Sequence, residues 1–206
     1  MRVRRLRVGD AICVLNGSGL RANCFISEVG RNSLLANIND WIEFDPKPRR
    51  LTIASAIPKR DRQRTMVDML TQLGVAKIIP LECKRSTTPA KAAMFGKWQR
   101  YAIEACKQSQ NPWLPEIAPS LSLHGLLADM QADAVYMYAD INGQKLAQLT
   151  NNGGDGVVII GPEGGFSEQE QLDMCNAGVK RLYLGDHILR TELAGVASAT
   201  QFFNMQ

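Results

Sequence analysis

The sequence predicts an α/β protein with a mostly parallel sheet, preceded by a small β unit. Residues 1–45 hold only short strand-like runs, whereas from residue 51 onward strand-like and helix-like segments alternate. Such alternation is typical of a parallel sheet with helices on both faces. A stiff segment, Asp45-Pro46-Lys47-Pro48, separates the two parts. We therefore expect two domains, over residues 1–46 and 47–206.

The first unit is expected to contain three strands, over residues 11–15, 20–29 and 33–38. Two glycine-bearing segments, Asn16-Gly17-Ser18-Gly19 and Gly30-Arg31-Asn32, are typical of the turns between them. Because three strands make a thin core, we expect this unit either to lean on the larger one or to lack a leading segment.

The second unit opens with an expected strand over residues 51–57 and a helix over 61–73, which Gly74 ends. The inward face of that helix is expected to carry Met66, Met69, Leu70 and Leu73. The elements expected next are a strand at 77–81, a helix at 91–109, an irregular stretch at 111–115, a helix at 122–130, a strand at 134–139 and a loop at 140–143.

The strongest local signals lie in residues 156–194. An apolar, β-branched run typical of a buried parallel strand ends at Gly161-Pro162-Glu163-Gly164-Gly165. Ser167 and Glu170 form a capping-box pair, which predicts a helix directly after the glycines. A second strand is expected over residues 179–184, followed by Gly185 and a final helix rich in small residues. Open α/β sheets bind ligands where such strand ends meet, so we expect a ligand site here.

The glycine loop lacks the patterns of the common phosphate sites. Neither G-x-x-x-x-G-K-[ST] nor a G-x-G-x-x-G after a strand occurs in the sequence. Glycines without Cβ atoms let backbone groups approach a flat ligand closely, which favours an adenosine held without a phosphate. Taken alone, a Gly/Pro cluster after a strand is also typical of a plain turn.

Charge is distributed unevenly over the 206 residues, whose formal net charge is +4. Residues 1–66 hold 13 Lys+Arg against 6 Asp+Glu, or +7, so the remaining residues carry 11 against 14, or −3. A basic N-terminal part suits a phosphate backbone as partner. A solvated basic face is an equally good interpretation of either basic cluster alone.

Composition argues against several other classes. No apolar run is long enough to cross a bilayer, and the N-terminus lacks the apolar segment of a signal peptide, so we expect a cytoplasmic protein. The five cysteines are scattered without a C-x-x-C pair, and only two histidines occur. Neither a disulfide framework nor a metal site is therefore expected.

Four segments together resemble the RsmE family: residues 59–87, 97–117, 159–170 and 184–194. Members of this family are S-adenosylmethionine-dependent methyltransferases of the SPOUT superfamily that methylate N3 of a uridine in bacterial small-subunit ribosomal RNA. The resemblance implies a small PUA-like β-barrel, incomplete here if a leading strand is missing, followed by a trefoil-knotted α/β domain that forms a homodimer. The implied partner is small-subunit ribosomal RNA or the small ribosomal subunit, with no membrane and no metal.

The resemblance also implies which residues surround S-adenosylmethionine (SAM). They are Ile160, Gly161, Pro162, Glu163, Gly164, Gly165, Leu184, Gly185, Ile188, Leu189, Thr191 and Ala194. We expect the apolar members of this set to sandwich the adenine while backbone groups read its edge. Plain core is the alternative for Ile160, Leu184, Ile188 and Leu189.

Uridine N3 carries a proton at neutral pH, so methylation there requires a proton acceptor or a stabilised anion. Arg190 is our candidate for stabilising the uracil anion, because a guanidinium offers both charge and paired donors. A salt bridge to Glu192 is the structural alternative. Glu163 or Glu192 could accept the proton or position Arg190. His124 and His187 are expected to have no catalytic part.

Basic residues are expected to bind the RNA substrate. The candidates are Arg2, Arg4, Arg5, Arg7, Lys59, Arg60, Arg62, Arg64, Lys84 and Arg85. Two other functions stay open. A non-catalytic RNA-binding or ribosome-assembly module is suggested by the short beginning and by Asn111, where the family commonly has Arg. A small-molecule α/β enzyme is the third, although it leaves the N-terminal basic surplus unexplained.

Overall fold

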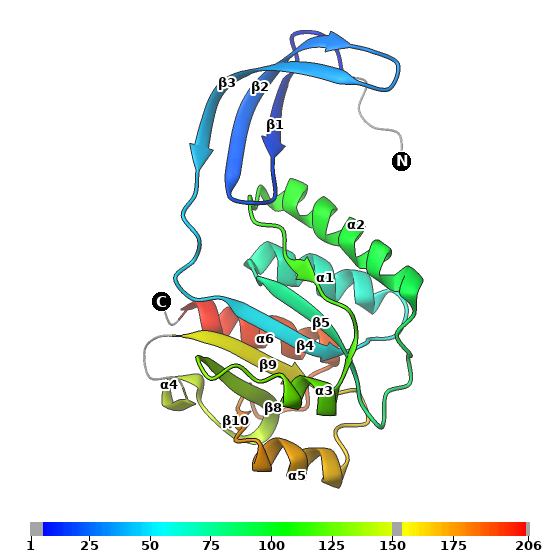
Figure 1. The fold of residues 1–206 in the computed structure, drawn as a ribbon, viewed down its shortest axis with the longest axis vertical. Helices are drawn as coiled ribbons and strands as arrows, with labels where there is room; N and C mark the ends of the chain where they lie inside the picture. Colours follow the sequence, from blue (N-terminus) through cyan, green and yellow to red (C-terminus); the bar gives the residue numbers. More distant parts are fainter. Residues whose placement is uncertain (1–5, 150–153, 205–206) are drawn as a thin grey trace.

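The computed structural model describes residues 6–149 and 154–204, which form two sheets (Figure 1). The first is an antiparallel sheet of three strands, β1 (Ala11–Leu15), β2 (Leu20–Val29) and β3 (Leu34–Glu43), in that order. The third strand extends beyond its expected end at residue 38, because its second half pairs with the start of β2, from Glu43 opposite Leu20 to Asp40 opposite Asn23.

The turn between β1 and β2 joins this sheet to the rest of the molecule. Gly19 N donates to Pro112 O at 3.0 Å, and Leu114 N donates to Gly17 O at 3.0 Å. A Cβ added at Gly19 would lie 2.4 Å from the Trp113 ring. A glycine is therefore required for the turn to lie this close.

The second sheet is parallel throughout, with strand order β10-β8-β9-β4-β5-β6 and with β7 also paired to β5. Its strands are β4 (Leu51–Ala56), β5 (Lys77–Glu82), β6 (Glu116–Ile117), β7 (Leu121–Ser122), β8 (Ala134–Gln144), β9 (Asp155–Ile160) and β10 (Lys180–Leu182). Because β9 lies between β4 and β8, the carboxyl ends of these three strands meet at one edge of the sheet.

Helices cover both faces of the larger sheet (Figure 1), as the alternation of segments predicted. One core, around Ile53, Trp98 and Phe202, lies under three helices, and a second core, around Ile159 and Met174, lies on the opposite face. The helices are α1 (Arg62–Leu73), α2 (Ala92–Ser109) and α6 (Thr191–Asn204) on the first face, α3 (Leu123–Ala128) and α5 (Glu168–Asn176) on the second, and a short α4 (Leu146–Leu149) beside β8 and β10.

The predicted inward face of α1 is wrong in one residue. Met69 is 44% exposed, whereas Val67 and Thr71 are buried. The helix contacts both α2 and α6, so its buried face is wider and turned further around the axis than a single apolar stripe indicates.

The loop predicted at residues 140–143 is also wrong, because β8 continues through it to Gln144, which pairs with Leu182 of β10. A Cβ at Gly143 would lie 2.5 Å from the Leu182 backbone, so this glycine permits close approach of two strands instead of a turn. Smaller differences are the shorter β10 and α3 and the unpredicted short elements β6, β7 and α4. None of the helices that the structure describes is long and apolar enough to cross a membrane.

Candidate functional site

A cavity of ≈ 430 Å³ lies at the carboxyl edge of the larger sheet, where the ends of β8 and β9 meet the segment that follows β10. Every residue expected to surround a cofactor lines it: Ile160, Gly161, Pro162, Glu163, Gly164, Gly165, Leu184, Gly185, Ile188, Leu189, Thr191 and Ala194. The structure therefore brings two distant glycine-bearing segments together around one space.

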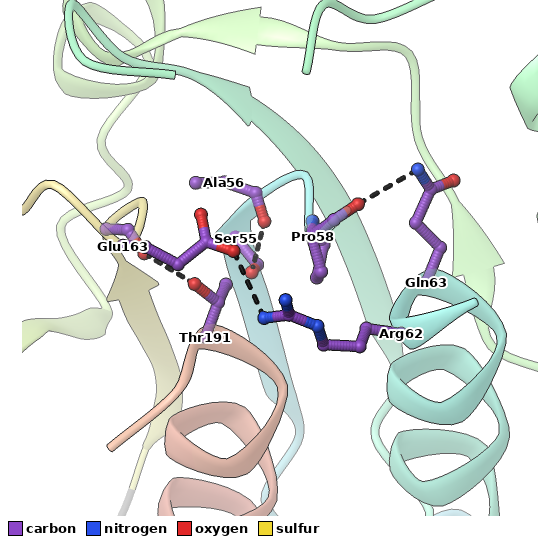
Figure 2. Close-up of polar contacts among 8 residues, drawn as sticks. Ser55, Ala56, Pro58, Arg62, Gln63, Glu163 and Thr191 are labelled. Carbon is purple, nitrogen blue, oxygen red and sulfur yellow. Dashed lines mark hydrogen bonds and ion pairs between the residues drawn. The ribbon is translucent and has the colours of Figure 1, made fainter. Parts of the chain in front are cut away.

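The glycine loop is a tight turn tied to the start of α6. Gly165 has a φ of +67°, and its N–H donates to Pro162 O at 2.8 Å, which closes the turn. Thr191 Oγ1 donates to Gly161 O at 3.2 Å (Figure 2). The left-handed backbone at Gly165 explains why a glycine stands there.

The predicted capping box is confirmed at the start of α5. Ser167 N donates to Glu170 Oε2 at 2.7 Å, and Glu170 N donates to Ser167 Oγ at 3.3 Å. Burial raises the pKa of the Glu170 carboxyl, but hydrogen bonds from the backbone of Ser167 and Lys84, with the charge of Arg85, outweigh burial and lower the pKa overall. The helix therefore begins directly behind the glycine loop and carries an ionised anchor.

Two arginines hold the glycine loop from outside. Arg62 Nη1, on α1, lies 3.2 Å from Glu163 Oε1, and Figure 2 shows this side chain reaching across from the helix to the loop. Arg85 Nη1, on the segment after β5, donates to Gly164 O at 3.0 Å and to Phe166 O at 3.2 Å. Both arginines are among the residues expected to contact RNA, and in this structure both contact the loop.

The apolar lining differs in exposure from residue to residue. Ile160 is buried, and Leu184 and Leu189 are half-buried against the core. Ile188 is 87% exposed on the cavity rim. Plain core is therefore excluded for Ile188, and an isoleucine this exposed beside a cavity is suited to covering an apolar ligand.

The ionisable side chains of the lining are mainly acidic. Asp140 and Glu163 contribute carboxylates, His187 contributes an imidazole, and no Lys or Arg is among the described lining residues. Since Glu163 is paired with Arg62 and no cationic side chain is among the described lining residues, the cavity disfavours a phosphate-bearing ligand.

Sequence reasoning missed several lining residues: Tyr138, Ala139, Asp140, Ile141, Phe166, Gln171 and His187. Asp140 and Ile141 fall in the predicted loop at 140–143, and Tyr138 and Ala139 lie in the predicted strand, but strand order decides which strand end lies beside β9. The expectation that His187 has no catalytic part stays a prediction, although the residue lies in the lining.

Of the three catalytic candidates, Glu163 lines the cavity, whereas Arg190 and Glu192 are not in its lining. Arg190 is exposed directly before α6, and its carbonyl accepts a hydrogen bond from Ala194 N at 2.8 Å. The ion pairs of the described residues do not include one between Arg190 and Glu192, so the salt-bridge alternative is wrong here. Glu192 Oε2 is buried without a hydrogen-bond partner in the described part of the chain.

The remaining basic candidates lie on the surface. Arg7, Lys59, Arg60 and Lys84 are exposed, and Arg64 lies over the Tyr101 ring at 5.6 Å. Arg2, Arg4 and Arg5 lie outside the described residues. Across residues 6–149 and 154–204, no group of three His, Cys, Asp or Glu side chains is placed to hold a metal ion.

Two family models match the sequence. The model described as RNA methyltransferase domain matches residues 45–202, and the model described as RNA methyltransferase PUA domain matches residues 1–39. Among curated relatives, Ribosomal RNA small subunit methyltransferase E of Rickettsia conorii is 28% identical over 207 residues, covering 97% of this chain and 82% of the relative. The enzyme of that name from Bacillus subtilis is 27% identical over 208 residues, covering 94% and 81%.

Solved structures show the same similarity. Ribosomal RNA small subunit methyltransferase E of Neisseria gonorrhoeae, crystallised with SAM, aligns with a TM-score of 0.90 at 28% identity, covering 98% of this chain and 85% of that one. A probable rRNA methyltransferase of Porphyromonas gingivalis aligns with a TM-score of 0.87 at 28% identity, covering 98% and 87%.

Proposed function

Since the chain belongs to the RNA methyltransferase family typified by small-subunit methyltransferase E, we propose that it transfers a methyl group from SAM to small-subunit ribosomal RNA, at N3 of a uridine. The observation that carries the proposal is the cavity at the carboxyl edge of the sheet, built from the glycine loop and the segment after β10. Its position is where open α/β sheets bind ligands.

The residues of the cavity fit SAM in size, polarity and charge. A volume of ≈ 430 Å³ is in the usual range for small-molecule sites. Ile160, Leu184, Ile188 and Leu189 supply apolar surface for the adenine, and the glycine loop supplies backbone groups. The carboxylate of Asp140 complements positive charge, whereas that of Glu163 is already ion-paired with Arg62. When bound, SAM supplies a methyl group on a positively charged sulfur.

We assign removal of the N3 proton, and stabilisation of the resulting anion, to residues of the glycine loop and of the start of α6. Arg190, exposed and free of an ion pair with Glu192, is proposed to stabilise the uracil anion. Of the two glutamates, Glu163 lines the cavity, which supports it as the acceptor. Glu192, whose Oε2 is buried without a hydrogen-bond partner among the described residues, is kept as the second candidate for the acceptor.

RNA is proposed to bind the three-stranded sheet and the exposed basic residues named below. We divide the chain at residues 1–46, a PUA-like unit that approaches RNA, and 47–206, a catalytic unit with a SPOUT-type trefoil knot. Lys59, Arg60 and Arg64 are proposed phosphate contacts. A homodimer and a cytoplasmic location complete the proposal, because the family resemblance implies the first and a ribosomal substrate the second.

The alternative of a non-catalytic RNA-binding module is weakened by the site. Every residue expected to surround SAM lies in the cavity lining. Asn111, which stands where the family commonly has Arg, has a structural role: its amide donates to Thr71 O at 2.9 Å and accepts from Trp113 N at 3.0 Å. These bonds shape the segment that receives the β1–β2 turn.

Methyl transfer to ribosomal particles tests the proposal. Small ribosomal subunits that lack the modification are incubated with the full chain and methyl-tritiated SAM, and the labelled nucleoside is identified by mass spectrometry. We expect label in 3-methyluridine. Label in another nucleoside would contradict the N3 assignment, and an RNA complex without any label would favour the binding module.

A further inference from the structure

Arg85 was expected to contact RNA, and its side chain is engaged elsewhere. It lies on the segment between β5 and α2, and its guanidinium donates to two carbonyls of the glycine loop, Gly164 O at 3.0 Å and Phe166 O at 3.2 Å. A Cβ added at Gly164 would lie 3.4 Å from Arg85 Cβ, so the aliphatic stem also lies against the loop. Both bonds come from Nη1, so one nitrogen of the exposed guanidinium is committed to the loop.

The same segment holds the helix behind the loop. Lys84 N donates to Glu170 Oε1 at 2.8 Å, while the other oxygen of that carboxylate accepts from Ser167 N. The segment after β5 therefore forms hydrogen bonds with both ends of the stretch from Gly164 to Glu170. The other side-chain anchors of the loop are Thr191 at Gly161 and Arg62 at Glu163, and its three glycines contribute no side chains.

We propose that Arg85 is a positioning residue for the SAM-binding loop and not an RNA contact. By fixing the carbonyls of Gly164 and Phe166, it holds the loop backbone in the shape that lines the cavity. The inference rests on the proposed function, since it takes the cavity to be the SAM site. Preorganised loops bind more tightly because less ordering is required on binding.

The test is calorimetric titration of SAM into the full chain without RNA, comparing wild type with Arg85→Ala. The loss of two loop hydrogen bonds is expected to weaken SAM binding about tenfold, which corresponds to ~1.4 kcal/mol. Arg100→Ala is the matched control, because Arg100 is exposed on α2 away from the loop contacts. It is expected to bind SAM as wild type does.

Arg85→Lys separates the two roles. A lysine preserves charge for a phosphate but lacks the planar guanidinium that places Nη1 within reach of both carbonyls, so a positioning role predicts impaired SAM binding and unchanged RNA affinity. Amide hydrogen exchange over residues 161–167 should be faster in both Arg85 variants while the rest of the sheet stays protected.

Two results would overturn the inference: SAM affinity within twofold of wild type in Arg85→Ala, or a loss confined to RNA affinity with a smaller dependence on salt. Failure of wild type to bind SAM at all is a different result, and it would contradict the proposed function itself.

Discussion

Arg190 stands directly before α6, exposed beside the cavity and without an ion pair to Glu192. If it stabilises charge that develops on the uracil, Arg190→Ala should lower the rate of methyl transfer by roughly 10²–10³-fold. SAM affinity should change little, because the side chain does not line the cavity.

Single-turnover methyl transfer and SAM titration measure the two effects separately. Arg100→Ala, which removes an exposed arginine from α2, serves as the control and should keep the wild-type rate. An Arg190→Ala protein as fast as wild type would remove this residue from the mechanism.

Glu170 makes a pH-dependent contribution to stability. Its pKa in the folded protein is lowered, so it lies below the unfolded value of about 4.3. The carboxylate therefore stabilises the fold above that pH, and the contribution is lost as pH falls through the lowered pKa. Chemical unfolding of wild type and Glu170→Gln between neutral pH and pH ~3 should show a stability difference that closes on the acid side.

Glu168→Gln controls for the loss of a charge in the same helical turn, because Glu168 is exposed. A difference between wild type and Glu170→Gln that persists or widens in acid would contradict the assigned role of the Glu170 carboxylate.

For single residues, the sequence predicted those features that neighbouring positions in the chain determine. The capping box and the turn at Gly161 to Gly165 follow from neighbouring residue types, because Ser167 and Glu170 are three positions apart. The contact of Arg85 with Gly164 joins residues 79 positions apart, so nothing in the local pattern separates it from a free surface arginine.

Glycines within helices and strands differ in whether the surrounding structure leaves room for a Cβ atom. In α6 (Thr191–Asn204), a Cβ at Gly195 would meet Leu70 and Ile53 at 3.7 Å and 3.8 Å, which is ordinary contact. Gly195→Ala should therefore stabilise the protein by about 0.5–1 kcal/mol through helix propensity. In β9, a Cβ at Gly156 would lie 2.5 Å from the Phe202 ring, so Gly156→Ala should destabilise by ~1–3 kcal/mol.

Denaturation midpoints of the two variants measured side by side check this contrast. Equal effects of the same sign would show that α6 does not pack on β4 and β9 as described.

Most elements could be predicted from periodicity, with errors where tertiary contacts decide. Residues 140–143 have the composition of a turn, but pairing with β10 extends the strand through them. Met69 fits an apolar stripe, yet α1 has two helical neighbours and buries Thr71 instead. In both cases the deciding partner lies far along the chain.

The two sheets are joined by the β1–β2 turn, where Gly19 packs closely on the Trp113 ring beside two backbone hydrogen bonds. Gly19→Ala should loosen the docking of the three-stranded sheet, because the added carbon would overlap the ring. Gly9→Ala is a matched control: both glycines have positive φ, +99° and +92°, but Gly9 has no neighbour within 4 Å.

Limited proteolysis at residues 45–50 measures docking, and we expect faster cleavage in Gly19→Ala than in Gly9→Ala, with SAM binding retained in both. Equal cleavage would indicate that the contact with Trp113 does not hold the sheets together.

For the whole molecule, alternation predicted a parallel sheet but not its strand order. The order places β9 between β4 and β8, and this is what gathers the cavity lining from residues 138–194. Periodicity carries no information on order, so the convergence of the two glycine-bearing segments was inferred from the general behaviour of open sheets. The trefoil knot rests on the family resemblance alone.

The central claim is that the edge of the parallel sheet holds the methyl donor, and titration of SAM into the full chain tests it most directly. The account predicts saturable binding of one SAM per chain, with protection from hydrogen exchange at the glycine loop and at residues 184–191. No detectable heat at millimolar SAM, or binding that leaves both segments unprotected, would contradict it.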